Sequence, residues 1–312
     1  MSRTENVFYD HPTDVLTVEV DWKPSTASGA GATFGSLSQT SSLRPSPGRR
    51  RTASKRSTRR RPARAARPGR APTWRSSTLT HPNLGAGRAF TAGASTPLWD
   101  DANGHGTHVA GTVGAIDNDR GVIGVAPDVT LHAVKMLNAT ATDLTSDIAA
   151  GIEWTADQGY GVGNLSLGGG TSTLREACQY AEDGGTLLIA ATGNDGPCSD
   201  CVSAPARYPE CVAVSATDEN DDLAGFSSTG PEVELAAPGA GVYSTYHADS
   251  YATLSGTSMA SPHVAGGAVQ LVADGYSRGE ARQRLKDTAA DVGLSEDESG
   301  AGRLDVAAAL GP

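Results

Sequence analysis

From Leu79 to the C-terminus, short apolar runs alternate with helix-like segments, and this alternation restricts the possible fold more than any other feature of the sequence. Residues 129–134 and 186–191 are two such runs, and Gly-rich turns separate them from segments with helical spacing such as residues 146–158. We place further helices after His105, around residues 174–180, after Ser258 and around residues 278–289. Alternating strands and helices predict an α/β domain with a parallel sheet.

Two different segments precede this domain. Residues 1–25 contain one stretch of period 2, residues 15–20, which predicts a short strand in what is otherwise an N-terminal remnant. Residues 26–78 consist almost wholly of Ser, Thr, Gly, Ala, Pro and Arg, and they hold almost no periodic apolar side chains that could form a core. We therefore expect this low-complexity basic segment, which makes up most of the N-terminal region, to be disordered.

The Arg-rich part of that segment allows two explanations. Its charge would permit binding to nucleic acid. Alternatively, the segment is read out of frame. If residues 73–78 are back-translated and read one nucleotide earlier, the codons are compatible with Asp-Val-Ala-Val-Ile-Asp, an apolar strand that ends in an aspartate. We favour the second explanation and expect no nucleic-acid partner.

The region from residue 79 onward is strongly acidic. Five of the 35 acidic residues and 15 of the 25 basic residues lie before it, which leaves 30 acids against 10 bases and a balance of −20. Such a charge opposes aggregation but also repels itself, and salt screens that repulsion. This balance predicts a halophilic protein.

The first motif that could carry chemistry is DANGHGTHVAG at residues 101–111, a turn of small residues before a helix. His105 and His108 are three residues apart with no Glu between them, unlike the HExxH zinc motif, so a zinc site is not expected. A single His often has only a structural role. The glycines on both sides of His105, however, allow close approach of a substrate, which favours a general base.

The second motif is SGTSMASPHVAG at residues 255–266, again a turn followed by a helix. Pro262 suits the first turn of that helix, where its missing N–H costs nothing. Ser258 would then lie at the positive end of the helix dipole, which is suitable for a nucleophile. A helix N-cap is the simpler role for Thr257 or Ser258 when the motif is considered alone.

A third motif, AATGNDG at residues 190–196, is an apolar strand that ends in a turn. The side-chain amide of Asn194 could donate a hydrogen bond to an oxyanion. Its alternative role is to tolerate a left-handed turn.

In the order His, Asn, Ser, these motifs resemble the subtilisin (subtilase) family, and most closely its haloarchaeal, halolysin-like members. The resemblance extends over residues 79–312, and it implies a three-layer α/β/α peptidase domain with a mostly parallel central sheet. It implies His105 as the base, Ser258 as the nucleophile and Asn194 as the oxyanion donor of a serine endopeptidase that forms an acyl-enzyme. The NLSLGG sequence at residues 164–169 matches the strand that pairs with substrate in the family. Five residues are expected to bind substrate: Ser166, Leu167, Gly168, Thr192 and Gly193.

One member of the family's catalytic set has no counterpart here. The family places an aspartate at the end of an early apolar strand, where this chain has Ser77 and Thr78. Asp100 and Asp101 belong to the histidine turn itself and are too close to His105 to replace it. Loss of the aspartate lowers turnover by about 10⁴ in trypsin-like and subtilisin enzymes. The alternative to an impaired enzyme is therefore an inactive, subtilase-like pseudoenzyme or peptide-binding relic.

The remaining expectations concern cofactors, cysteines and location. No cofactor is needed for the chemistry, although residues 117–119 resemble a loop where family members bind structural calcium. Four cysteines allow three pairings, and we prefer Cys178–Cys211 together with a local Cys198–Cys201 link. Polypeptide substrates, a monomer and an extracellular location follow from the resemblance. The chain shows neither a signal peptide nor an apolar run of about 18 residues that could span a membrane.

Overall fold

The computed structural model of the 312-residue chain describes residues 16–21, 88–89, 101, 103–137, 145–169, 172–246 and 249–311. The predicted low-complexity segment at residues 26–78 lies outside these residues. So do Asp100 and the residues on either side of the expected start of the domain at Leu79.

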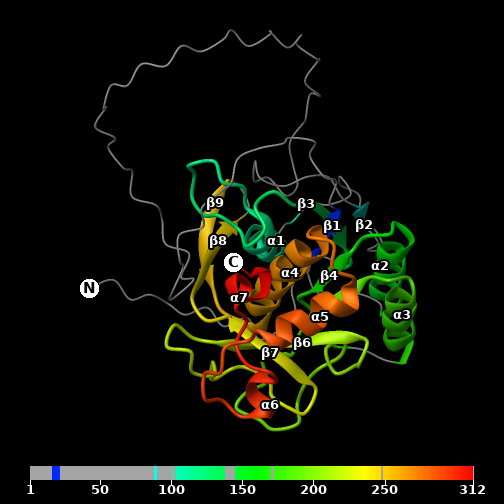
Figure 1. Ribbon diagram of the computed structural model, residues 1–312. Coiled ribbons are helices and arrows are strands. Elements are labelled where there is room, and N and C mark those ends of the chain that lie inside the picture. Colours follow the sequence, from blue (N-terminus) through cyan, green and yellow to red (C-terminus); the bar gives the residue numbers. More distant parts are fainter. Residues whose placement is uncertain are drawn as a thin grey trace, which may run out of the picture.

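A seven-stranded sheet forms the centre of the molecule (Figure 1). Its order is β2-β3-β1-β4-β5-β6-β7. Neighbouring strands are parallel in the pairs β2/β3, β4/β5, β5/β6 and β6/β7, which confirms the predicted, mostly parallel α/β architecture. The strands are β1 (Leu16–Asp21), β2 (Arg88–Ala89), β3 (Thr130–Lys135), β4 (Val162–Leu165), β5 (Leu187–Ala191), β6 (Cys211–Thr217) and β7 (Val233–Pro238).

Seven helices and a separate hairpin complete the part of the chain that the structure describes. The antiparallel hairpin is formed by β8 (Val242–Tyr246) and β9 (Ser250–Leu254). The helices are α1 (His105–Gly114), α2 (Thr145–Asp157), α3 (Ser172–Asp183), α4 (Thr257–Ala273), α5 (Arg278–Asp287), α6 (Glu296–Ser299) and α7 (Val306–Leu310). The five helices that the sequence predicted correspond to α1 to α5.

Strand side chains alternate between two cores, which gives the predicted three layers. In β5, Leu187 and Ile189 pack toward a core shared with α1, α4, α5 and α7. Leu188 and Ala190 point to the other face, where α2 and α3 cover a second core (Figure 1). Because β5 and β6 are buried on both faces, their sequences are continuous apolar runs rather than alternating ones.

Strand β1 is the short strand that the sequence predicted at residues 15–20, but its place in the sheet was not predicted. Residues 16–21 lie in the middle of the sheet, between β3 and β4. The strand runs antiparallel to both neighbours, with Leu16 opposite Lys135 and Asp21 opposite Thr130. Strands β3 and β4 each have backbone groups to satisfy on this side, and β1 supplies hydrogen-bond partners to both.

Among the described residues, no helix is both long enough and apolar enough to cross a lipid bilayer.

Candidate active site

The turn before α1 is held by a single carboxylate, that of Asp101. Its Oδ1 accepts the N–H of Gly104 at 2.7 Å and that of Asn103 at 3.2 Å. Its Oδ2 accepts the N–H and the hydroxyl of Thr107 at 2.6 and 2.5 Å. Gly104 has a φ of 92°, a left-handed conformation that other residues adopt only with strain. The sequence assigned Asp101 to the histidine turn, and the structure agrees, because both carboxylate oxygens bind within that turn.

Helices α1 and α4 lie side by side and run in the same direction. A Cβ on Gly266, eight residues after Ser258, would lie 3.5 Å from the carbonyl of Val113, which is eight residues after His105. Nearer the N-termini, His263 of α4 is close to His108 of α1, since the pKa of His108 is lowered mainly by burial and to a smaller extent by His105 and His263. The half-buried residues His105 and Ser258 therefore occupy equivalent positions at neighbouring helix starts.

Two buried histidines support these helices in the neutral form. His108 Nε2 lies 3.0 Å from the carbonyl of Val242, and burial lowers the pKa of His108 from 6.5 to about 3. His263 Nδ1 lies 2.9 Å from the carbonyl of Met259, and burial lowers the pKa of His263 to about 4. Since each carbonyl can only accept, the contacting ring nitrogen carries the proton in both residues. Because these pKa values lie well below 7, both histidines stay neutral near neutral pH and act as structural hydrogen-bond donors.

The turn before α4 is held by Asn194, which follows β5. Asn194 Oδ1 accepts the N–H of Thr257 at 2.9 Å and its hydroxyl at 3.1 Å. The amide nitrogen of Asn194 then lies 3.5 Å from where a Cβ on Gly256 would be. An amide whose oxygen is fixed in this way keeps its N–H donors available beside the turn that carries Ser258. The sequence predicted the donor but not its support by Thr257, because the two residues are 63 positions apart.

Ser258 also contacts the segment after β4. Its hydroxyl lies 3.5 Å from the carbonyl of Ser166, which is a long contact, and the hydroxyl of Ser166 donates to the carbonyl of Ser258 at 2.8 Å. Ser166 and Leu167 are both buried, and the side chain of Leu167 belongs to the core under α2 and α3. Contact of residue 167 with a substrate can therefore involve its backbone only.

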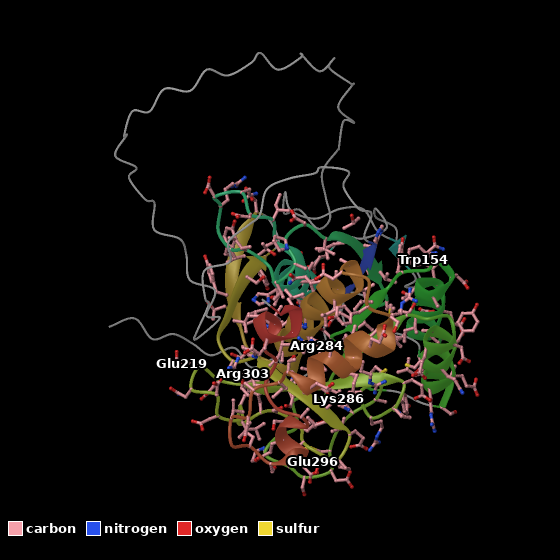
Figure 2. All side chains as sticks on the ribbon, in the orientation of Figure 1. Trp154, Glu219, Arg284, Lys286, Glu296 and Arg303 are labelled. Carbon is pink, nitrogen blue, oxygen red and sulfur yellow. A yellow bond between two sulfur atoms is a disulfide. The ribbon has the colours of Figure 1, made fainter. Side chains whose placement is uncertain are left out.

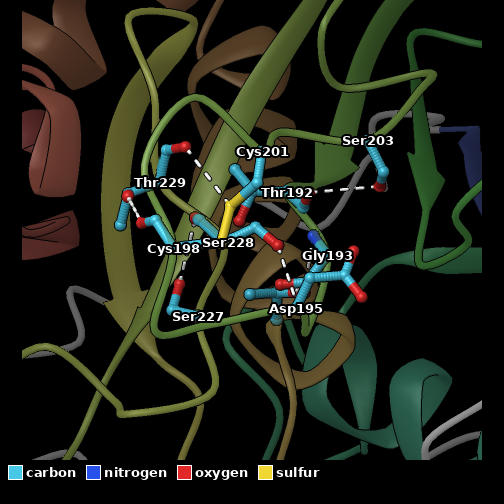
Figure 3. Close-up of a disulfide and its surroundings, with 10 residues drawn as sticks. Thr192, Gly193, Asp195, Cys198, Cys201, Ser203, Ser227, Ser228 and Thr229 are labelled. Atoms are coloured by element: carbon cyan, nitrogen blue, oxygen red, sulfur yellow. Dashed lines mark hydrogen bonds between the residues drawn. A yellow bond between two sulfur atoms is a disulfide. The ribbon is translucent and has the colours of Figure 1, made fainter.

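The other predicted substrate-binding residues converge on Ser203, which the sequence analysis missed. A Cβ on Gly168 would lie 3.1 Å from Ser203 Oγ, and one on Gly193 would lie 3.0 Å from it. Ser203 donates its N–H and its hydroxyl to the carbonyl of Thr192 at 2.8 and 3.1 Å (Figure 3). The segments that follow β4 and β5 thus approach each other around one serine, and no motif in the sequence marked it.

A disulfide and its hydrogen bonds fix the loop beyond Asn194 (Figure 3). Cys198 and Cys201 are bonded, as the sequence predicted. Cys198 O accepts the hydroxyl of Thr229 at 2.6 Å, and the carbonyl of Thr229 accepts the N–H of Cys201 at 2.9 Å. The loop is therefore attached to the segment before β7 at two points.

The preferred Cys178–Cys211 disulfide is wrong for this structure. Both cysteines are buried and reduced, one on α3 and the other at the start of β6. A hydrogen bond with Cys178 and burial raise the pKa of the Cys211 thiol well above its usual range. The two side chains are neighbours, as the preference required, but they pack as thiols.

The expected calcium loop lies on the surface. Residues 117–119 are exposed, and Asn118 Oδ1 accepts the N–H of Arg120 at 3.2 Å. Nowhere in the described ranges do three His, Cys, Asp or Glu side chains gather in a way that could hold a metal ion. Calcium binding at this loop therefore stays a prediction.

Comparisons with known protein sequences all identify the same family. A family profile described as "Subtilase family" matches residues 88–303. Subtilisin DY of Bacillus licheniformis is 47% identical over 67% of this chain and 78% of its own length. Subtilisin Savinase of Lederbergia lenta is 45% identical over 74% of this chain and 86% of its own.

Solved structures give the same result. Sphericase superposes with a TM-score of 0.67 at 34% identity, over 74% of this chain and 88% of its own. A structure titled S41 Psychrophilic Protease also gives 0.67, at 36% identity and the same coverage.

Proposed function

The chain belongs to the subtilase family of serine endopeptidases, and from this premise we propose that Ser258, His105 and Asn194 carry its chemistry. Ser258 attacks the carbonyl of a peptide bond, and His105 takes the hydroxyl proton and returns it to the leaving amine. Asn194 donates to the oxyanion of the tetrahedral intermediate. Water then releases the acyl-enzyme. No cofactor takes part in these steps.

The observation that best supports this assignment is the fixed amide of Asn194. Its oxygen accepts the N–H of Thr257, whose hydroxyl proton is within reach of both this oxygen and the Gly193 carbonyl, and the amide nitrogen lies at the turn before Ser258. A donor held in place before the reaction begins needs no reorganisation when charge develops, which is the main advantage of an oxyanion hole. The alternative role, that of tolerating a left-handed turn, does not apply, because Asn194 is not among the described residues with a positive φ.

We assign polypeptide binding to the segments after β4 and β5. An extended peptide would lie beside Ser166 and Gly168, with its side chain before the scissile bond facing Thr192, Gly193 and Ser203. Main-chain pairing of this kind is sequence-tolerant, so the side chains around Ser203 would set the preference. We propose a monomer, because one chain supplies all of these groups.

The second candidate, an impaired or inactive relative that binds peptides, is supported by β1. This strand runs antiparallel to its neighbours, so Asp21 lies opposite Thr130 at the amino end of β3, away from the carboxyl ends that lead to Ser166 and Thr192. The carboxylate of Asp101 is engaged by Thr107 and Gly104. We therefore expect turnover about 10⁴ below that of a complete triad.

Casein hydrolysis by the purified chain, with Ser258→Ala as control, distinguishes the two candidates. An endopeptidase releases peptides slowly, and the variant releases none. A peptide binder shows equal, negligible release for both proteins while still binding a casein-derived peptide. Release that persists in Ser258→Ala would contradict the assignment of the nucleophile.

We also propose that residues 79–312, completed by strand β1 in their sheet, form the peptidase domain and that the segment 26–78 is read out of frame. The compatibility of residues 73–78 with an apolar strand ending in aspartate supports this proposal. Resequencing the DNA that encodes residues 20–85 tests it. A defect of one or two nucleotides is expected, and a confirmed, intact frame would contradict it.

We further propose that the enzyme is extracellular and halolysin-like. Its halophilic character is inferred from the balance of −20 over residues 79–312. The described bases are largely paired, for example Lys286 with Glu234 and Arg303 with Asp221, whereas carboxylates such as Glu219 and Glu296 are exposed (Figure 2). The Debye length falls from about 10 Å at 0.1 M salt to about 3 Å at 1 M, so repulsion weakens in brine. Thermal melts should give a midpoint that rises with KCl, and a flat or falling midpoint would reject the halophilic proposal.

A further inference from the structure

Pro262 lies one turn deeper in α4 than the sequence predicted. The helix begins at Thr257, so Pro262 is inside it rather than in its first turn. In an α-helix the carbonyl of residue i accepts the N–H of residue i+4. For Ser258 that residue is Pro262, which has no N–H. The carbonyl of the proposed nucleophile therefore cannot make its ordinary helical bond.

The hydroxyl of Ser166 lies where that missing donor would be needed. It donates to the carbonyl of Ser258 at 2.8 Å, although the two residues are 92 positions apart and belong to different elements. Ser166 is 1% exposed, so water does not compete for this bond. A buried carbonyl without a donor would cost about 1–3 kcal/mol, which is why such groups are almost always satisfied.

The hydrogen bonds around Ser166 can be assigned in only one direction. Its single proton goes to Ser258, because a carbonyl can only accept. In the 3.0 Å contact between the hydroxyls of Ser166 and Ser261, Ser261 must then be the donor. The side-chain amide of Asn164 donates to the same oxygen at 2.9 Å. Two donors thus fill the lone pairs of Ser166 and direct its proton to Ser258.

We propose that Ser166 is a positioning residue for the nucleophile, replacing the helical donor that Pro262 removes. By fixing the Ser258 carbonyl it fixes the orientation of the peptide unit between Ser258 and Met259 and, with it, the start of α4. The same residue begins the segment proposed to bind substrate, so one side chain connects peptide binding to the nucleophile. This role rests on the proposed function only where catalysis is measured, since the hydrogen bond itself can be observed without activity.

The first measurement is the carbonyl resonance of Ser258. Met259 is the only methionine that follows a serine, so labelling with [¹³C-carbonyl]serine and [¹⁵N]methionine makes the Ser258–Met259 peptide the only labelled pair. Loss of a hydrogen bond moves a carbonyl ¹³C signal upfield. We expect that shift in Ser166→Ala but not in Thr186→Ala, which removes another buried hydroxyl that donates to a carbonyl, that of Tyr160 at 2.9 Å. An unmoved signal in Ser166→Ala would overturn the proposal.

The second measurement is the rate at which a fluorophosphonate probe labels Ser258. Ser166→Ala should lower this rate by about ten- to hundred-fold, the effect expected from a displaced reacting group. Thr186→Ala should keep the rate of the parent, and Ser258→Ala should remove labelling. A Ser166→Ala protein that labels as fast as the parent would overturn the proposal. If the parent itself is not labelled, the proposed function fails, and the carbonyl resonance alone decides the role of Ser166.

Rescue separates positioning from a general loss of stability. Pro262→Ala restores an N–H four residues after Ser258. In the double variant Ser166→Ala/Pro262→Ala, the Ser258 carbonyl signal should therefore return toward its position in the parent, and most of the labelling rate should return with it. Thermal melts of all variants record folding separately. Failure of Pro262→Ala to rescue either readout in a folded double variant would show that Ser166 does not act through the Ser258 carbonyl.

Discussion

The helices α1 and α4, whose first turns carry the proposed catalytic residues, differ in where the side chain that accepts their first N–H groups comes from. At α1, one carboxylate binds the turn, and all its partners lie within six residues of Asp101. At α4, the partners of the turn are Asn194 and Ser166, which are 63 and 92 residues away. The N–H groups of the histidine turn thus have a local acceptor, although the hydroxyls of Tyr246 and Thr245 in β8 also donate to the carbonyls of Asn103 and Thr107. The side-chain partners of the serine turn instead follow β5 and β4, so they are in place only when these strands lie beside it.

This difference has a functional reason in the proposed mechanism. The turn before α1 supplies the position of His105, and a local turn can do so. A nucleophile must also face an oxyanion donor and a bound peptide, and these come from other strands. The comparison predicts that changes near α4 affect activity more than folding, and that changes near α1 do the reverse.

The largest expected effect is on activity, from Asn194→Ala. This variant removes the proposed oxyanion donor. In subtilisin, removal of the corresponding donor lowers kcat by about 10²–10³, and we expect a decrease of similar size here. The N–H and the hydroxyl of Thr257 also lose Asn194 Oδ1 as an acceptor. Because Asn194 is exposed, water can replace that oxygen, so the loss of stability should be small. Probe-labelling rates and thermal melts of the variant measure both quantities. A large loss of stability without a loss of rate would contradict the comparison.

Asp101→Ala is the matched change at α1. It leaves the N–H groups of Gly104 and Thr107 and the Thr107 hydroxyl without their acceptor in a buried turn. We expect a loss of about 2–4 kcal/mol in the free energy of unfolding, more than an ordinary helix cap provides. Asp101→Asn, which keeps one acceptor oxygen, should lose less. Urea unfolding of the three proteins checks the order, and equal stability of all three would show that the carboxylate does not hold the turn.

Acid should affect the two helices alike, because each contains one buried neutral histidine. The folded-state pKa values are about 3 for His108 and about 4 for His263, both below the usual 6.5. The unfolded chain therefore takes up protons first, and stability is lost as pH falls below about 6.5. Each histidine contributes a slope of up to about 1.4 kcal/mol per pH unit.

Replacing each histidine by an amide side chain that keeps the donating nitrogen isolates its contribution to the pH dependence of stability. His108→Gln keeps a donor at the position of Nε2, and His263→Asn keeps one at the position of Nδ1. Unfolding measured between pH 7 and pH 4 should show a slope reduced by about 1.4 kcal/mol per pH unit in each variant. An unchanged slope in either one would mean that its histidine is already charged in the folded protein.

The smallest expected effect comes from the glycines before the two helices. Gly104 has a φ of 92°, so Gly104→Ala should cost about 1–2 kcal/mol of stability through backbone strain. Gly256 is extended, and a Cβ there would make only ordinary contact with Asn194 at 3.5 Å. Gly256→Ala should therefore be nearly neutral for stability. Chemical denaturation of both variants tests the difference, and an equal loss would remove this part of the comparison.

Much of the fold could be predicted because it depends on local patterns. The apolar runs of β5 and β6 and the spacing of α2 are properties of consecutive residues, and they predicted the parallel sheet and its helices. The placement of β1 could not be predicted in this way. Its period of 2 indicated a strand, but its position between β3 and β4 and its antiparallel direction depend on which neighbouring strands have backbone groups to satisfy.

For the candidate site, the sequence by itself determined the residue types and the local turns. Asp101 and Gly104 define the histidine turn within a few residues, and the Gly-rich flanks of His105 and Ser258 marked both helix starts. Only the tertiary structure decided that Cys178 and Cys211 pack as thiols, that Ser203 lies between Gly168 and Gly193, and that Ser166 donates to Ser258. The physical reason is the range of the contacts: a turn closes through neighbours in the chain, whereas a hydrogen bond between residues 92 positions apart forms only after the sheet has brought their elements together.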